Sequence, residues 1–178
     1  MNKLPQVIIS ILSLLLFLNC KKEAINPKND YSQKANQVIQ QVILDDEGNC
    51  IMEIPNESEI EISLAENPSF DIRKKVIKEL HLKNRTELDS LEKLTNSFIL
   101  DSSFLKQRNI KVIKPGFLSE MIKDTLSFRT CRKGILSISK PIFDKNYTTA
   151  IIYYGHALTC IGSLPIVYRY QKGKWNTK

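Results

Sequence analysis

The last quarter of the chain alternates apolar and polar residues in a way that predicts an antiparallel sheet. Ile135–Phe143 alternates, Thr148–Tyr154 is apolar on both faces, and Ile166–Gln171 alternates again before Trp175. β-branched and aromatic residues dominate these runs. A strand that is apolar on both faces is typical of the centre of a sheet, so we expect Thr148–Tyr154 to lie there. Polar and glycine-containing segments predict the connections: Asp144–Asn146, Gly155–Ser163 and Lys172–Lys174. The alternation also predicts one common face in the first strand for Leu136, Ile138 and Ile142.

The preceding part of the chain shows helical spacing of apolar residues. In Lys34–Leu44 valine and isoleucine pairs recur four residues apart; a helix and a strand both fit, and we favour the helix. Asp71 is a candidate cap for an amphipathic helix that ends near Leu82. Thr86-Glu87-Leu88-Asp89 has the general form of a capping box, and the helix that it would start aligns Leu88, Leu91, Leu94 and Phe98. A further amphipathic helix is expected over Leu118–Leu126, with Leu118, Met121 and Ile122 facing inward.

Three shorter segments have strand character. Cys50–Ile54 and Ile110–Ile113 are short and apolar, and Glu57–Glu66 resembles an edge strand because Glu59 and Glu61 alternate with isoleucines. Charged residues on an edge strand protect it from aggregation, which explains these carboxylates better than a calcium site or a glycosidase-like pair. We therefore expect an α+β fold in which N-terminal amphipathic helices pack on a C-terminal antiparallel sheet.

The N-terminus has the pattern of a secretory signal. Lys3 is followed by an apolar run from Val7 to Leu18 and then by Cys20. The run is too short for a transmembrane helix, which needs about 20 residues. We therefore expect residues 1–19 to be a signal peptide, residues 20–33 a tether, and residues 34–178 a single α+β domain.

A cysteine at the end of such an apolar run resembles the lipobox of bacterial lipoproteins. Asn19 and Phe17 depart from the usual residues, and lysine after Cys20 is similar to lipoproteins of Bacteroidota. The resemblance implies cleavage before Cys20, acylation of its sulfur and amino group, and a membrane-anchored protein of the cell envelope, in the inner or the outer membrane. Acyl chains of this number anchor a protein stably. The alternative is an ordinary secretory signal or an uncleaved anchor in which Cys20 is incidental.

Composition narrows the classes of partner. The chain carries 26 basic and 19 acidic residues, a formal charge of +7. The basic residues are scattered, and the longest run is Arg73–Lys75 without interleaved aromatic residues, so we do not expect a nucleic-acid partner.

The cysteines after Cys20 are Cys50, Cys131 and Cys160, an odd number that allows one intramolecular disulfide. Cys131 and Cys160 both lie beside predicted strands, so we expect this pair if a bridge forms; small buried thiols are an equally good interpretation. No CxxC motif is present to indicate metal or redox chemistry.

Sequence motifs for catalysis are scarce. The two histidines, His81 and His156, are far apart, and the sequence contains no GxSxG, GxGxxG or P-loop motif. We therefore predict no catalytic residue, metal or cofactor. His156 lies in the predicted loop just after the central strand, and Tyr168 and Tyr170 share a face. These three residues are the candidate face for a small molecule, glycan or peptide, and core packing is the alternative.

The C-terminal region is also similar to small secreted Bacteroidota proteins of unknown activity. The similarity rests on four segments: Leu136–Phe143, Thr149–Tyr153, Cys160–Gly162 and Lys172–Trp175. It implies no site residue. The sequence thus favours a cell-envelope lipoprotein that is a non-catalytic binding module. An immunity or inhibitor protein that binds an envelope-acting enzyme is a second hypothesis, and a hydrolase with a dispersed site is a third.

Overall fold

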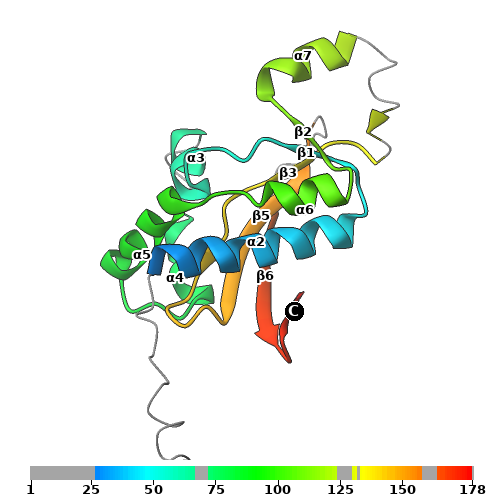
Figure 1. The fold of residues 1–178 in the computed structure, drawn as a ribbon. Helices are drawn as coiled ribbons and strands as arrows, with labels where there is room; N and C mark the ends of the chain where they lie inside the picture. Colours follow the sequence, from blue (N-terminus) through cyan, green and yellow to red (C-terminus); the bar gives the residue numbers. More distant parts are fainter. Residues whose placement is uncertain (1–26, 67–71, 124–129, 132, 158–163, 178) are drawn as a thin grey trace, which may run out of the picture.

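A seven-stranded mixed sheet forms the centre of the protein (Figure 1). The computed structural model describes residues 27–66, 72–123, 130–131, 133–157 and 164–177. The strand order is β2-β1-β3-β5-β6-β7, and β4 pairs with β5 beyond β3. Their bounds are β1 Cys50–Met52, β2 Lys111–Ile113, β3 Leu136–Ile138, β4 Ile142–Phe143, β5 Thr149–His156, β6 Leu164–Gln171 and β7 Lys174–Thr177.

The predicted α+β class is confirmed, and the C-terminal strands are antiparallel as predicted, but the sheet as a whole is mixed. The strands from β3 to β7 pair antiparallel, as their alternation indicated. However, β1 pairs in parallel with both β2 and β3. β1 lies far from β2 and β3 in the chain, so their pairing depends on the whole fold. Neither β1 nor β2 carries a local sequence signal for it.

The central strand is β5, as predicted. It pairs with β3 and β4 on one side and with β6 on the other. Ala150 and Ile152 belong to one core cluster, and Ile151 and Tyr153 belong to another, so the strand buries both faces. Its continuous apolar sequence is the direct consequence.

A one-residue bulge divides the predicted strand Ile135–Phe143 into β3 and β4. Ile138 lies opposite Tyr154 and Ile142 lies opposite Ile151, so four residues advance against three on β5. The Ser139 hydroxyl accepts the Tyr153 N–H at 3.0 Å inside this irregular stretch. The extra residue reverses the alternation. Ile142 therefore faces the cluster opposite to that of Ile138, which corrects the common face predicted from the sequence.

The helices cover both faces of the sheet and flank it (Figure 1). They begin and end as follows: α2 Pro27–Asp46, α3 Glu59–Glu66, α4 Arg73–Glu79, α5 Arg85–Glu92, the 3-10 helix η1 Lys93–Ser97, α6 Ser102–Gln107 and α7 Pro115–Lys123. No helix in these described ranges is long and apolar enough to cross a membrane.

The first face is covered by α2, which is 20 residues long and crosses the sheet strands in Figure 1. Its buried residues Val38, Ile39, Val42 and Ile43 pack in one cluster with β3, β5 and β6. This confirms the helical interpretation of Lys34–Leu44. The helix begins at Pro27 and buries the Tyr31 side chain, so the domain starts before Lys34 and the tether predicted for residues 20–33 is too long.

The second face is covered by three short helices. Ile60 of α3, Val76 of α4 and Leu88 of α5 pack against Ile142 and Ile151 of the sheet. The predicted helix after Asp71 is confirmed as α4, although Asp71 itself lies outside the described residues. Leu94 and Phe98 pack on the α2 side instead of continuing the predicted stripe with Leu88, because η1 follows α5 directly.

The prediction of an edge strand over Glu57–Glu66 is wrong, since this segment forms α3. Ser58 and Glu61 form a reciprocal capping box: the Glu61 N–H donates to Ser58 Oγ at 3.2 Å, and the Ser58 N–H donates to Glu61 Oε2 at 2.9 Å. The alternation of Glu59 and Glu61 with two isoleucines is a short pattern. The helix-start signal of Ser58 and Glu61 outweighs it.

The capping box predicted at Thr86 is also displaced by two residues. Asn84 caps α5 by accepting the Glu87 N–H at 3.0 Å. The Glu87 carboxylate in turn accepts the Lys83 N–H. Glutamate three residues after asparagine is the stronger form of the motif, whereas the Thr86 version ends in aspartate.

The disulfide joins Cys50 to Cys131, which are 81 positions apart in the sequence and have a Cα–Cα distance of 5.5 Å. This corrects the expected Cys131–Cys160 pair; Cys160 lies outside the described residues. The bridge links the start of β1 to the segment before β3, and both sulfur atoms are buried with Ile135. Parallel pairing of β1 and β3 brings these cysteines together, and no local sequence pattern indicates that pairing.

Candidate functional site

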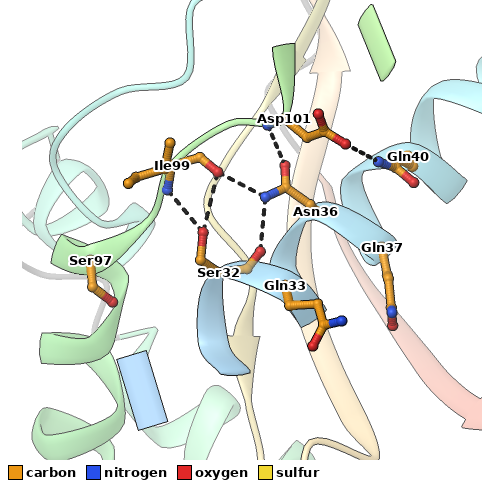
Figure 2. Close-up of a pocket in the computed structure, with 8 residues that line it drawn as sticks. All are labelled: Ser32, Gln33, Asn36, Gln37, Gln40, Ser97, Ile99 and Asp101. Carbon is orange, nitrogen blue, oxygen red and sulfur yellow. Dashed lines mark hydrogen bonds between the residues drawn. The ribbon is translucent and has the colours of Figure 1, made fainter. Parts of the chain in front are cut away.

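A hollow of about 580 Å³ lies between α2 and the segment that leads into α6. We call it the α2 hollow. Figure 2 shows its side chains: five come from α2 and three from the Ser97–Asp101 region. They are Ser32, Gln33, Asn36, Gln37, Gln40, Ser97, Ile99 and Asp101.

Helix periodicity explains the α2 side of the hollow. Gln33, Gln37 and Gln40 are spaced by four and three residues, which places them along one stripe of a helix. Ala35, Val38 and Ile39 are buried on the sheet side of the same helix. The apolar stripe of α2 packs against the sheet. The carboxamide stripe of the same helix therefore lies beside the sheet and does not pack against it.

Hydrogen bonds hold the other wall of the hollow in place. The Asn36 amide nitrogen donates to the Ile99 carbonyl at 2.8 Å, and its oxygen accepts the Asp101 N–H at 2.7 Å. Ser32 Oγ accepts the Ile99 N–H at 3.1 Å. These bonds join segments more than 60 residues apart, so the hollow is fixed by tertiary structure (Figure 2).

One carboxylate lies at the edge of the hollow. Asp101 caps α6 by accepting the Ser103 N–H at 3.0 Å, and it also accepts Gln40 Nε2 at 3.2 Å. The hydrogen bond from the Ser103 hydroxyl is the main cause that lowers the pKa of Asp101, and the bonds from the Ser103 and Phe104 amides and from Gln40 add to it. Asp101 therefore stays charged at neutral pH, but its oxygen atoms already have partners.

Two carboxamides of the α2 hollow retain free hydrogen-bonding groups. In Figure 2, Gln33 and Gln37 form no hydrogen bond with the other residues drawn. The Gln37 Oε1 atom is buried and has no hydrogen-bond partner in the described part of the chain. A buried acceptor without a donor costs roughly 1–3 kcal/mol, so this oxygen favours any group that brings an N–H or O–H to it. Each carboxamide can donate two hydrogen bonds and accept two.

The candidate face predicted from Tyr168, Tyr170 and His156 has a different role. Tyr168 is fully buried under α2, its hydroxyl donates to Asp45 at 3.2 Å, and burial raises its pKa. This corrects the prediction of an open aromatic face. Tyr170 shares the face, as predicted from parity, but it packs on Trp175 with ring centroids 5.2 Å apart and lies under the Lys34 ammonium at 4.3 Å.

His156 connects the end of β5 to α2. Its Nε2 lies 3.0 Å from Asp46 Oδ1, and the imidazole is about one-third exposed at 36%. The contact holds the last turn of α2 against the sheet. Residues 158–163, the rest of the predicted loop, lie outside the described residues, as does Cys20.

The α2 hollow was not predicted from the sequence. The signal that was available is the run of amides at helical spacing in Gln33–Gln40. A polar stripe on an amphipathic helix is ordinarily solvated, so only the position of Ser97–Asp101 against it distinguishes a binding surface from a plain surface. No group of histidine, cysteine or acidic side chains in the described part of the chain is arranged to hold a metal ion.

Comparisons with known proteins identify no relative, because no family model, curated protein or solved structure matches this chain.

Proposed function

We propose that this protein is a lipid-anchored binding module of the cell envelope. We also propose that its α2 hollow binds a neutral ligand by recognising secondary amide groups of that ligand. The anchor is Cys20, which follows an apolar run of signal-peptide length. The binding role rests on one observation: Gln37, whose Oε1 is buried without a donor, lines a hollow of about 580 Å³.

The chemistry of the lining selects the ligand class. A carboxamide matches an amide group in both directions, since each offers an N–H donor and a carbonyl acceptor. Gln33 and Gln37 form no hydrogen bond with the other lining residues, whereas the polar atoms of Asn36 are occupied by the hollow's own wall. Ile99 is 75% exposed at the rim and offers an apolar contact next to them. Peptide segments and N-acetylated sugars both combine amides with apolar groups.

Calorimetric titration tests the binding role. The probes are a terminally blocked alanine tetrapeptide and an N-acetylglucosamine tetramer, which distinguish the two sources of amide groups. Gln37→Ala should weaken binding of the accepted probe by roughly three- to tenfold, the contribution of about one hydrogen bond.

The matched control is Gln41→Ala. Gln41 is on the same helix but outside the hollow, and its amide donates to Asp45 at 2.8 Å. This variant should bind like the original protein. Failure of both probes to bind, or equal weakening by the two substitutions, would contradict the proposed role of the hollow.

Membrane fractionation tests the anchor independently. Cys20→Ala should move the protein from the membrane fraction to the soluble envelope fraction, because the substitution removes the acylated sulfur. Cys160→Ala makes the same chemical change elsewhere in the chain and should leave the protein in the membrane. If the Cys20 variant stays in the membrane fraction, the anchor is not a lipid on this cysteine.

An immunity or inhibitor role is the second proposal. The specific observation in its favour is a pair of exposed apolar side chains beside the outer strand, Val112 and Phe117. Exposed apolar groups of this kind are common where proteins contact partners.

A further inference from the structure

The outer strand β2 has an open edge. Among the described residues it pairs only with β1. The Lys111 N–H donates to the Asn49 carbonyl at 2.9 Å, and the Ile113 carbonyl accepts the Glu53 N–H at 2.8 Å. Successive residues of a strand direct their backbone groups to opposite edges, so the N–H and C=O of Val112 point away from β1. These groups are placed to pair with a further strand.

The segment around this edge is strongly basic. Ser102–Ser119 contains four basic residues and no acidic one. All four side chains are exposed, and none forms an ion pair with another described residue. They are Lys106, Arg108, Lys111 and Lys114. Glu53, which directly follows β1, is an acidic residue next to the edge. A surface of this charge attracts an acidic partner and repels a basic one.

Apolar side chains lie beside the same edge. Val112 is 42% exposed and Phe117 is 57% exposed. Phe117 belongs to α7, which follows β2 directly and extends away from the helices that cover the sheet (Figure 1). Leu118 of this helix packs on the cluster around the disulfide. A segment that pairs with β2 would therefore contact apolar side chains as well as lysines.

We propose that the β2 edge binds an extended acidic segment of a protein partner, which adds to the sheet as a strand. The backbone of Val112 supplies main-chain hydrogen bonds, the four basic side chains select acidic residues, and Val112 and Phe117 contact apolar ones. This is strand addition, in which main-chain pairing gives affinity and side chains give specificity. A second copy of this chain fits poorly, because its formal charge is also +7.

A fluorescence-anisotropy titration of the full-length protein tests this inference. The probe is a labelled, terminally blocked peptide of alternating glutamate and valine. A second probe has the same side chains but N-methylated amides at alternate positions, which removes donors needed for strand pairing. We expect the first probe to bind and the N-methylated probe to bind at least tenfold more weakly. Equal binding of both probes would overturn strand addition and leave charge attraction alone.

Charge reversal tests the location of the site. Lys111→Glu combined with Lys114→Glu should weaken binding of the first probe at least tenfold. The control is Lys172→Glu combined with Lys174→Glu, which makes the same change in net charge at the exposed turn between β6 and β7. Equal effects of the two double variants would overturn the assignment to β2.

Vesicles with anionic phospholipid form the last arm of the test. The protein used here carries Cys20→Ala, so that a lipid anchor does not dominate the result. Binding to the vesicles without binding to the glutamate–valine peptide would overturn the proposal in favour of a membrane surface. No binding to either would overturn it as well. None of these outcomes depends on Gln37 or the α2 hollow, so the two proposals fail separately.

Discussion

The two faces of the sheet are covered in different ways, although β5 buries apolar residues on both. A single helix of 20 residues, α2, covers one face, and its cluster is rich in aromatic rings. Phe143 there lies 5.7 Å from both Tyr31 and Trp175, measured between ring centroids. The other face is covered by α3, α4 and α5, which are seven or eight residues long.

The difference shows how the same strand can support two kinds of packing. A long helix is fixed at many points along its length, so one part cannot move without the rest. Helices of two turns are marginal on their own and depend on caps and on tertiary contacts. We therefore expect the α2 side to be rigid and the α3–α5 side to adjust. A rigid α2 also suits its polar stripe, where ligand groups must be positioned accurately.

Neighbouring isoleucines on β5 provide the largest test of this difference. Ile152 faces the α2 cluster and Ile151 faces the other, and both are buried. Truncation of a core isoleucine costs about 2–5 kcal/mol, with the larger values where the cavity cannot collapse. Ile152→Ala should lower the free energy of unfolding by about 4 kcal/mol and Ile151→Ala by about 2–3 kcal/mol.

Urea denaturation of the two variants measures this directly. Each serves as the control for the other, because the substitution, the strand and the degree of burial are matched. A larger loss of unfolding free energy in Ile151→Ala than in Ile152→Ala would show that the three short helices are the more rigid cover.

The cap of α3 gives the next largest effect. Ser58 is 2% exposed; its hydroxyl caps α3 and also donates to the Glu92 carboxylate of α5. Ser58→Ala should destabilise the protein by about 2 kcal/mol, because it removes a cap and leaves a half-buried carboxylate without its donor. Ser90→Ala on α5 is the control, since this exposed hydroxyl bonds only within its own helix, to the Thr86 carbonyl. Equal melting temperatures for the two variants would contradict a role of the cap.

The predictability of the fold follows the same division. The helix over Lys34–Leu44 was favoured because valine and isoleucine pairs recur four residues apart, and β5 was predicted because its segment is apolar on both faces. The short α3 was mistaken for a strand, since Glu59–Ile62 fits both periods and only Ser58 and Glu61 distinguish them.

Features that depend on distant segments were not predictable from local patterns. The parallel pairing of β1 brings Cys50 to Cys131, and the bulge near Ser139 reverses the faces of β4. The α2 hollow exists because Asn36 binds the backbone at Ile99 and Asp101, and no spacing in the sequence encodes that contact. Tyr168 was predicted to be part of a ligand-binding face, but α2 covers it and its side chain is buried.

The smallest expected effect concerns the charge of Glu92 on the α3–α5 side. Burial raises the pKa of this carboxyl, and the nearby charges of Glu61 and Asp89 raise it further, against the Ser58 hydrogen bond and Arg73. A carboxyl whose pKa is raised by folding destabilises the folded state while it is ionised. The penalty is present above the raised pKa and disappears as the pH falls through that value and then through the ordinary glutamate value.

Glu92→Gln should therefore stabilise the protein slightly at pH 7, and the difference from the original protein should vanish near pH 4. Thermal unfolding across this pH range measures it, and Glu53→Gln, an exposed carboxylate on the β1 side, controls for the loss of one negative charge. The glutamine oxygen can still accept the Ser58 hydroxyl. If Glu92→Gln is instead destabilising at pH 7, the ionised carboxylate contributes more through Ser58 and Arg73 than it loses by burial. The short helices would then be held by charge as well as by caps.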